Sequence, residues 1–392
     1  MKKIFFIFLF MLFLLSATGY GNTLKNGTIR RKILTFPEAQ MQTLAGKIVK
    51  SMTLEEKIGQ MMIVGIDGTS VDKNAIELLE KYHVGGIIFF DKNMQSKSQV
   101  RVLISELNAK ADDKDLPLFM AIDQEGGKVT RMSQALYTAP AAAALAAEGD
   151  GHKIYQAARM TALDIKRLGF NLNFAPVLDL DYSSKERSYG KTAAQVVQNA
   201  GIAAQGYEDS GILFAFKHFP GIGKGVKDTH VGASSVVTNK ETLMKEDVFP
   251  FKELIHRFPN DEFMVMTGHL QYQVFSNLPA SVDKQIVTDL LRRELGFTGV
   301  AITDDMGMGA LRENFTPGQA GIKAVQAGED ILLVCHGQLP KVQVYEAVLA
   351  AVKSGQIPAS RIDEAATRIV LVKLKNLVTY RELKQFAEIY TK

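Results

Sequence analysis

Short apolar runs alternate with longer segments of helical periodicity along most of this chain. Eight of these runs have the length and the apolar composition of buried strands. They cover residues 59–65, 85–90, 118–122, 172–177, 214–219, 263–267, 299–303 and 331–335. Regular alternation of this kind predicts strands joined by helical crossovers, which is the arrangement of a parallel sheet.

Amphipathic or alanine-rich segments separate the apolar runs, and we predict that they form the crossover helices. They cover residues 73–82, 96–110, 193–209, 240–256, 284–295 and 317–327, and two further helices are expected at 342–354 and 363–377. Eight largely apolar strands favour a single closed (β/α)8 TIM-type barrel. An open doubly wound sheet is the alternative, since element counts from one sequence are easily wrong by one.

The beginning of the chain has the three parts of a secretory signal. Lys2 and Lys3 precede an apolar run at residues 4–15, and small residues follow up to Gly21. We therefore expect a signal peptide at 1–21, an irregular segment at 22–40 and one barrel domain at 41–392, in a protein exported to the periplasm or the exterior. The run is shorter than the roughly 20 apolar residues of a spanning helix, so no stable membrane insertion is expected after cleavage. An uncleaved anchor is the alternative.

The composition of the chain limits the classes of partner that the protein is expected to bind. Hydrophobic residues make up 46% of the chain and charged residues 22%, which is typical of a globular protein. Two charges of the formal net charge of +4 belong to the leader, so no nucleic-acid surface is indicated. The single cysteine, Cys335, is followed by His336, but no other cysteine could complete a closed metal site, and we interpret Cys335 as a core residue. We expect no cofactor and no metal. The oligomeric state stays open.

Polar residues cluster where the apolar runs end. In a barrel these ends open onto one face, where active sites are built, although solvated loop charges would also follow strands. The residues concerned are Asp123, Asp179, Asp181, Lys217, His218, His269, Asp304, Asp305 and His336.

The glycine-rich segment FKHFPGIGKGVKDTH, residues 216–230, could be a phosphate loop or a flexible connection. A phosphate loop requires Ser or Thr directly after its lysine and a helix at once, whereas Gly225 follows Lys224. Asp228 and His230 lie two positions apart, so in an extended loop the carboxylate can hold one ring nitrogen while the other faces a substrate. This pair is a candidate acid/base dyad, although such triplets are usually structural.

Asp304 and Asp305 end the seventh run, and consecutive side chains on a strand face opposite ways. We expect one of them to face the barrel mouth, where a carboxylate could attack an anomeric carbon, and the other to anchor the loop. A pair of helix-capping aspartates is the alternative. Asp123 with Arg131 would make a sugar clamp, and Arg187, Lys217 and His218 add further donors, although each alone is more often structural.

At these residues the chain resembles glycoside hydrolase family 3, within it the bacterial β-N-acetylglucosaminidases. The resemblance runs from about residue 45 to 375, through the blocks IDQEGGKVTRM, NFAPVLDLD, ERSYG, KHFPGIGKGVKDTH, MTGHLQY and ITDDMGM. It implies that Asp304 is the nucleophile and that His230, held by Asp228, is the general acid/base. It also implies that the sugar-binding positions are Asp123, Arg131, Arg187, Lys217 and His218.

One departure from the family pattern lies in the loop. Family members commonly read K-H-F-P-G-H-G-D, but Ile222 and Lys224 stand here in place of the histidine and the acidic residue. The leading hypothesis is an exported exo-β-N-acetylglucosaminidase acting on cell-wall muropeptides or chitin-like oligosaccharides. A β-glucosidase or broad β-glycosidase, and a catalytically silent sugar-binding protein, are the alternatives.

Overall fold

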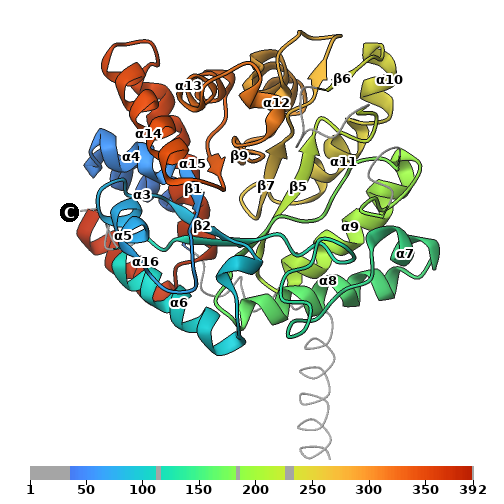
Figure 1. Ribbon diagram of the computed structural model, residues 1–392, viewed down its shortest axis with the longest axis horizontal. Coiled ribbons are helices and arrows are strands. Elements are labelled where there is room, and N and C mark those ends of the chain that lie inside the picture. The colour runs from blue at the N-terminus through green and yellow to red at the C-terminus, as the bar shows by residue number, and fades with distance from the viewer. Residues whose placement is uncertain (1–35, 112–115, 182–185, 226–233, 391–392) are drawn as a thin grey trace, which may run out of the picture.

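The computed structural model describes residues 36–111, 116–181, 186–225 and 234–390, and eight parallel strands form its centre (Figure 1). The segment predicted as a signal peptide lies outside these residues. The strands pair in the order β10-β1-β2-β3-β4-β5-β7-β9. They are β1 (Met62–Gly65), β2 (Gly86–Phe89), β3 (Phe119–Ile122), β4 (Leu172–Asn173), β5 (Leu213–Phe219), β7 (Phe263–Thr267), β9 (Val300–Thr303) and β10 (Leu332–Val334). All eight predicted strands are confirmed.

The sheet closes between its last strand, β9, and its first, β10. Ile302 and Ile331 form a parallel bridge, and the Thr303 amide donates to the Ile331 carbonyl at 3.0 Å. The Thr303 hydroxyl in turn accepts from the Leu333 amide at 3.0 Å. Because these bonds join the two edges, the strands form the predicted barrel rather than an open sheet.

Helices lie around the outside of the strands (Figure 1). They are α3 (Glu38–Ser51), α4 (Leu54–Gln60), α5 (Lys73–Glu80), α6 (Lys97–Lys110), α7 (Ala142–Ala147), α8 (Gly151–Lys166), α9 (Ala193–Asp209), α10 (Lys240–Lys245), α11 (Phe249–Arg257), α12 (Gly309–Arg312), α13 (Pro317–Ala327), α14 (Gln338–Lys353), α15 (Ala359–Asn376) and α16 (Tyr380–Tyr390). A π-helix, η3 (Gln285–Glu294), stands where a crossover helix was predicted, and short 3-10 turns occur at η1 (Asp91–Asn93) and η2 (Ala280–Val282).

Both ends of the described chain pack together outside the barrel. α3 begins at Glu38, inside the segment expected to be irregular, and contacts α15 and α16. Their facing side chains, among them Leu44, Ile48, Val370 and Phe386, form a second apolar cluster beside the main core. This cluster fastens the N-terminal helix and the last helix to the barrel.

The single helix predicted at 240–256 is wrong. The structure has two helices there, α10 and α11, with Glu246, Asp247 and Val248 between them. Pro250 explains the break, because proline lacks an amide hydrogen and its ring collides with the carbonyl four residues earlier. The structure also adds a two-stranded sheet of β6 (Ser235–Val236) and β8 (Gln271–Tyr272), each too short to leave a pattern in the sequence.

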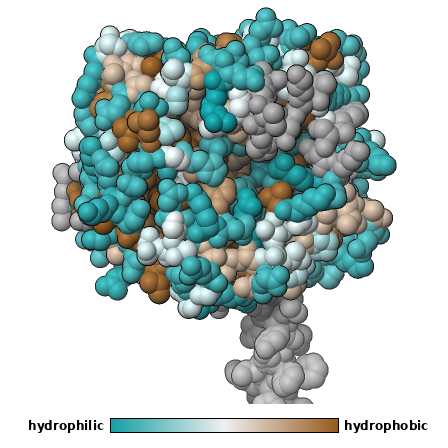
Figure 2. Space-filling model, in the orientation of Figure 1, coloured by the Kyte–Doolittle hydropathy of each residue, from teal (hydrophilic) through white to brown (hydrophobic). Residues whose placement is uncertain are grey.

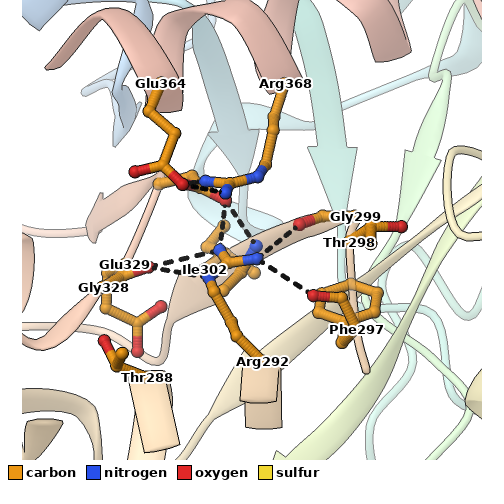
Figure 3. A network of polar contacts seen from close by, with 12 residues as sticks. Thr288, Arg292, Phe297, Thr298, Gly299, Ile302, Gly328, Glu329, Glu364 and Arg368 are labelled. Atoms are coloured by element: carbon orange, nitrogen blue, oxygen red, sulfur yellow. Dashed lines mark hydrogen bonds and ion pairs between the residues drawn. The ribbon is translucent and has the colours of Figure 1, made fainter. Parts of the chain in front are cut away.

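A buried ionic network holds the start of β10 to the helices around it (Figure 3). Asp330 is fully buried and accepts from Arg292 of η3 at 2.5 Å, and from Arg361 and Arg368 of α15 at 2.8 and 3.0 Å. It also accepts from the Ala301 amide of β9 at 3.1 Å. The network therefore ties β9 and β10 to their covering helices at the end of the barrel opposite the strand ends predicted to carry the site.

Hydrophilic side chains cover most of the face shown in Figure 2, and hydrophobic ones gather only in small separate patches. Within residues 36–111, 116–181, 186–225 and 234–390, none of the helices has both the length and the apolar character needed to cross a bilayer.

Candidate active site

Seven of the nine polar residues that the sequence placed after strands are linked by contacts at the carboxyl ends of β3, β4, β5, β7 and β9, whereas the His336 ring packs against Phe90. Asp123 follows β3, Lys217 and His218 lie near the end of β5, and Asp304 follows β9. The Lys217 ammonium lies 2.7 Å from Asp123, and Nε2 of His218 lies 4.0 Å from an Asp304 oxygen. Asp228 and His230 lie in residues 226–233, outside the described part of the chain, so the acid/base dyad stays a prediction.

Lys217 is the centre of a buried ionic cluster. Its ammonium lies 2.7 Å from an Asp123 oxygen and 2.6 Å from a Glu125 oxygen, and its side chain is 3% exposed. Arg187 grips the same Glu125 carboxylate through two hydrogen bonds, both 2.7 Å. Arg187 therefore contacts Glu125 in this structure, and Lys217 links that pair to Asp123.

Glu125 is the residue of this cluster that the sequence analysis missed. Burial alone would raise its pKa, but the charges of Lys217 and Arg187 and their hydrogen bonds lower the pKa of Glu125 to about 2. The opposite holds for Lys217, since its two carboxylates outweigh burial and raise the pKa of its ammonium. Both groups thus stay charged, which keeps Asp123 beside a fixed positive charge.

Asp123 and Arg131 form the more exposed side of the cluster. An Arg131 nitrogen lies 3.8 Å from an Asp123 oxygen, and another lies 3.7 Å from Asp91. The guanidinium also sits over the Phe90 ring, 5.5 Å from its centre. The side chains of Asp123 and Arg131 are 19% and 20% exposed, so a ligand in the mouth could exchange hydrogen bonds with both.

His218 connects a buried carboxylate to Asp304. Its Nδ1 lies 2.7 Å from Asp179, which is fully buried, and its Nε2 lies 4.0 Å from an Asp304 oxygen. Asp179 thus pairs with one ring nitrogen of His218, and the other ring nitrogen is the one nearest Asp304. Asp179 also accepts from the amides of His218 at 3.2 Å and Ile222 at 2.9 Å. It therefore fixes both the ring and the chain that leaves β5.

Asp304 and Asp305, which directly follow β9, make different contacts. Asp305 accepts from the amides of Gly307 at 3.0 Å and Cys335 at 2.9 Å, which anchors the loop after β9 to β10. The Asp304 side chain remains 22% exposed and accepts from the Asp305 amide at 2.8 Å. Asp305 therefore anchors the loop, as expected of one carboxylate of the pair, and the Asp304 carboxylate remains partly accessible.

The surroundings of Asp304 favour its anionic form. Burial would raise its pKa, but His218, His269, the Asp305 amide and Lys217 together lower the pKa of Asp304 below its ordinary value. His269 supports the loop from below, with Nε2 3.0 Å from the Asp305 carbonyl and Nδ1 2.7 Å from the Ser281 hydroxyl. Burial lowers the pKa of His269, and the charge of Asp304 opposes this shift. An ionised carboxylate at this place can act as a nucleophile.

Cys335 is buried, as interpreted from the sequence, and burial raises the pKa of its thiol far above the usual range. Its thiol is therefore inert, and its backbone amide serves Asp305.

Comparison with known proteins agrees with this geometry. Residues 53–372 match the Glycosyl hydrolase family 3 N terminal domain. The chain is 32% identical to beta-hexosaminidase LpqI of Mycobacterium tuberculosis over 82% of this chain and 83% of that protein. It is also 32% identical to beta-hexosaminidase A of Pseudoalteromonas piscicida, over 78% of this chain but only 56% of that longer protein.

Solved structures give the same result. A family 3 beta-N-acetylglucosaminidase from Paenibacillus superposes with a TM-score of 0.80 and 34% identity, covering 86% of this chain and 68% of that one. The structure of M. tuberculosis LpqI superposes with a TM-score of 0.77 and 30% identity, covering 84% and 96%. The chain therefore belongs to glycosyl hydrolase family 3 and is a glycoside hydrolase related to the bacterial β-hexosaminidases of that family.

Proposed function

We propose that this protein is an exported, retaining exo-β-N-acetylglucosaminidase that removes terminal N-acetylglucosamine from muropeptides or chitin-like oligosaccharides. The observation that carries the proposal is the Asp304 carboxylate, which is partly exposed at the barrel mouth and has a lowered pKa. The names of its relatives, beta-hexosaminidase and beta-N-acetylglucosaminidase, support the choice of sugar.

In the first step an Asp304 oxygen attacks the anomeric carbon while the bond from that carbon to the leaving oxygen breaks. His230, oriented by Asp228, donates a proton to the leaving oxygen, and a glycosyl-aspartate ester results. In the second step His230 takes a proton from water, the water oxygen attacks the anomeric carbon, and the Asp304 carboxylate is released. Both steps proceed by inversion, so the sugar leaves with its original configuration.

The ionic cluster at the end of β3 and β5 supplies the binding contacts for the sugar. Asp123 would accept hydrogen bonds from sugar hydroxyls, and Arg131 and Lys217 would donate to their oxygens. Arg187 would contribute indirectly, because its hydrogen bonds to Glu125 hold that carboxylate, and through it Lys217, in place. His218 would lie between this cluster and Asp304, where Nε2 can reach the ring substituents nearest the nucleophile.

The function is tested first with 4-nitrophenyl β-N-acetylglucosaminide beside the corresponding β-glucoside. Turnover of the acetamido sugar alone supports the proposal, whereas equal turnover of both indicates a broad β-glycosidase. Failure to cleave either, with binding of N-acetylglucosamine retained, indicates a sugar-binding protein.

The two roles are tested separately. A 5-fluoro N-acetylglucosaminyl fluoride should label one peptide, and tandem mass spectrometry should place the added mass on Asp304. His230→Ala should still form the ester from the nitrophenyl substrate, whose leaving group needs little protonation, and azide should restore turnover by giving a glycosyl azide. Label on another residue, or His230→Ala with wild-type rates, contradicts the assignment.

Export is tested on the cells that make the protein. Fractionation should find it outside the cytoplasm, and its intact mass should lack the predicted signal of residues 1–21. A full-length mass in the membrane fraction would support the anchored alternative.

A further inference from the structure

Lys224 stands where the family commonly has an acidic residue, and the structure shows what it contacts. Its ammonium lies 2.7 Å from Asp247 and 2.5 Å from Glu246, two of the three residues between α10 and α11. The Lys224 side chain is 18% exposed and that of Asp247 only 1%. A mostly buried ion pair therefore joins the glycine-rich chain after β5 to the break between two helices.

Asp247 has little else to hold its charge. One of its oxygens has no hydrogen-bond partner among the described residues. Burial raises the pKa of Asp247 to about 6, with Glu246 and Asp179 adding to the rise and Lys224 opposing it. Burial raises the pKa of the nearby Tyr272, and the charges of Asp179 and Asp247 add to that rise. Within the part of the chain that the structure describes, Lys224 is thus the cation that stabilises this carboxylate.

The same short stretch of chain also contacts the catalytic apparatus. The Ile222 amide donates to Asp179 at 2.9 Å, and Asp179 holds the His218 ring that faces Asp304. Asp247 also packs so closely on Gly221 that a Cβ there would lie 2.8 Å from the Cβ of Asp247. Residues 221–225 therefore lie between Asp247 on one side and Asp179 on the other.

We propose that Lys224 is a positioning residue that, through Asp247 and Glu246, holds residues 221–225 against Asp179 and so keeps His218 aligned with Asp304. The acidic residue of the family pattern could not make this contact, because it would face two carboxylates. The replacement by lysine thus suits the acidic pair that this chain carries between α10 and α11.

The kinetic test of this proposal rests on the proposed function, whereas a second test, by hydrogen exchange, does not depend on it. Lys224→Met should lower kcat by about tenfold and leave KM within about twofold, because its partners Glu246 and Asp247 are not predicted sugar-binding residues. Hydrogen exchange of the peptide around Ile222, measured without substrate, should become faster. Lys224→Arg should keep most of kcat. Lys245→Met removes an exposed ion pair with Glu241 and serves as the matched control, with no change in either measurement.

A double variant separates positioning from simple charge balance. Lys224→Met leaves Asp247 buried without its cation and should lower the melting temperature, whereas Lys224→Met/Asp247→Asn removes both charges and should recover it. If kcat stays low and exchange stays fast while the melting temperature recovers, the positioning role is supported. If kcat and exchange recover together with the melting temperature, Lys224 only neutralises a buried charge and the proposal is overturned. If the wild type cleaves no β-N-acetylglucosaminide, the proposed function fails while exchange still decides the role of Lys224.

Discussion

The two ends of the barrel both contain buried ionic clusters, but the clusters differ in how completely their charges are satisfied. At the start of β10, three arginines and one amide surround the two oxygens of Asp330, which is fully buried. At the opposite end, Asp123, Arg131 and Asp304 keep about a fifth of their side-chain surface exposed, and the contacts from Arg131 to Asp123 and from His218 to Asp304 are 3.8 and 4.0 Å long.

The difference separates a cluster that holds the fold from one that can exchange partners with a ligand. A saturated carboxylate gains nothing from a substrate and loses much when a partner is removed. A carboxylate with one short bond and a free direction can form a bond to an incoming carbon or hydroxyl. The comparison therefore predicts opposite effects for the same substitution at the two ends.

Asp304→Asn should have the largest effect on activity. The amide can keep the bond from the Asp305 amide, so the folded structure should persist, but a neutral amide is not a nucleophile. We expect kcat/KM for 4-nitrophenyl β-N-acetylglucosaminide to fall by about 10⁴-fold or more, with a melting temperature close to that of the wild type. A fall of less than about tenfold would remove Asp304 from the role of nucleophile.

Asp330→Asn should show the reverse pattern. Loss of the charge removes the carboxylate that Arg292, Arg361 and Arg368 share and leaves Glu364 as the partner of the last two. We expect the free energy of unfolding to fall by about 3–5 kcal/mol. kcat of the folded protein should hardly change. Asp289→Asn, which breaks an exposed pair with Arg293 on η3, is the control and should cost less than about 1 kcal/mol. A large loss of kcat in Asp330→Asn, below its melting temperature, would contradict the comparison.

The strands, and the end of the barrel that carries the site, could be predicted from the sequence because both depend on the order of neighbouring residues in the chain. An apolar run followed at once by a polar residue, as before Asp123 and Asp304, marks a strand that ends at a site. The split at Pro250 was also visible in principle, and the prediction of one helix there ignored it.

The partners within the site could not be predicted, because they depend on distances across the barrel. His218 and Asp179 are 39 residues apart, and Glu125 and Arg187 are 62 apart. Nothing local distinguishes a buried, doubly paired Glu125 from a glutamate in a turn. The same applies to Lys224. The sequence shows that a lysine stands where the family has an acidic residue, but it does not show that Asp247 is the partner of this lysine.

Glu329, which precedes Asp330 in the chain, allows a test of how stability depends on pH. It is fully buried beside Asp330, and one of its oxygens has no partner among the described residues. Burial raises the pKa of Glu329 to about 8, against the hydrogen bond from Thr267 and the charge of Arg292. The folded protein thus binds this proton between pH 4.5 and about 8 whereas the unfolded chain does not, so stability should fall as pH rises through that window.

Glu329→Gln imitates the protonated acid and should flatten this dependence. Between pH 6 and pH 9, ionisation of Glu329 should lower the melting temperature of the wild type by several degrees. In Glu329→Gln this part of the decrease should be absent. Glu253→Gln, at an exposed carboxylate of α11, should leave the profile unchanged. Parallel profiles for the wild type and Glu329→Gln would show that Glu329 is ionised in the folded protein.

Tyr272→Phe should have the smallest effect. It removes an uncharged hydrogen bond at the end of the barrel that carries the candidate active site. The buried Tyr272 hydroxyl donates to the Gly221 carbonyl at 2.6 Å, so it pins the same stretch of chain as Lys224. Its loss should cost about 1 kcal/mol, or about 2 °C in melting temperature, and lower kcat by less than about threefold, because the ion pair to Asp247 remains. A loss of kcat as large as that of Lys224→Met would mean that the chain is held at Gly221 rather than through its lysine. The ion pair between Lys224 and Asp247 would then contribute to stability alone. The two ends of the barrel would then differ in their effect on activity only at Asp304 and its neighbours.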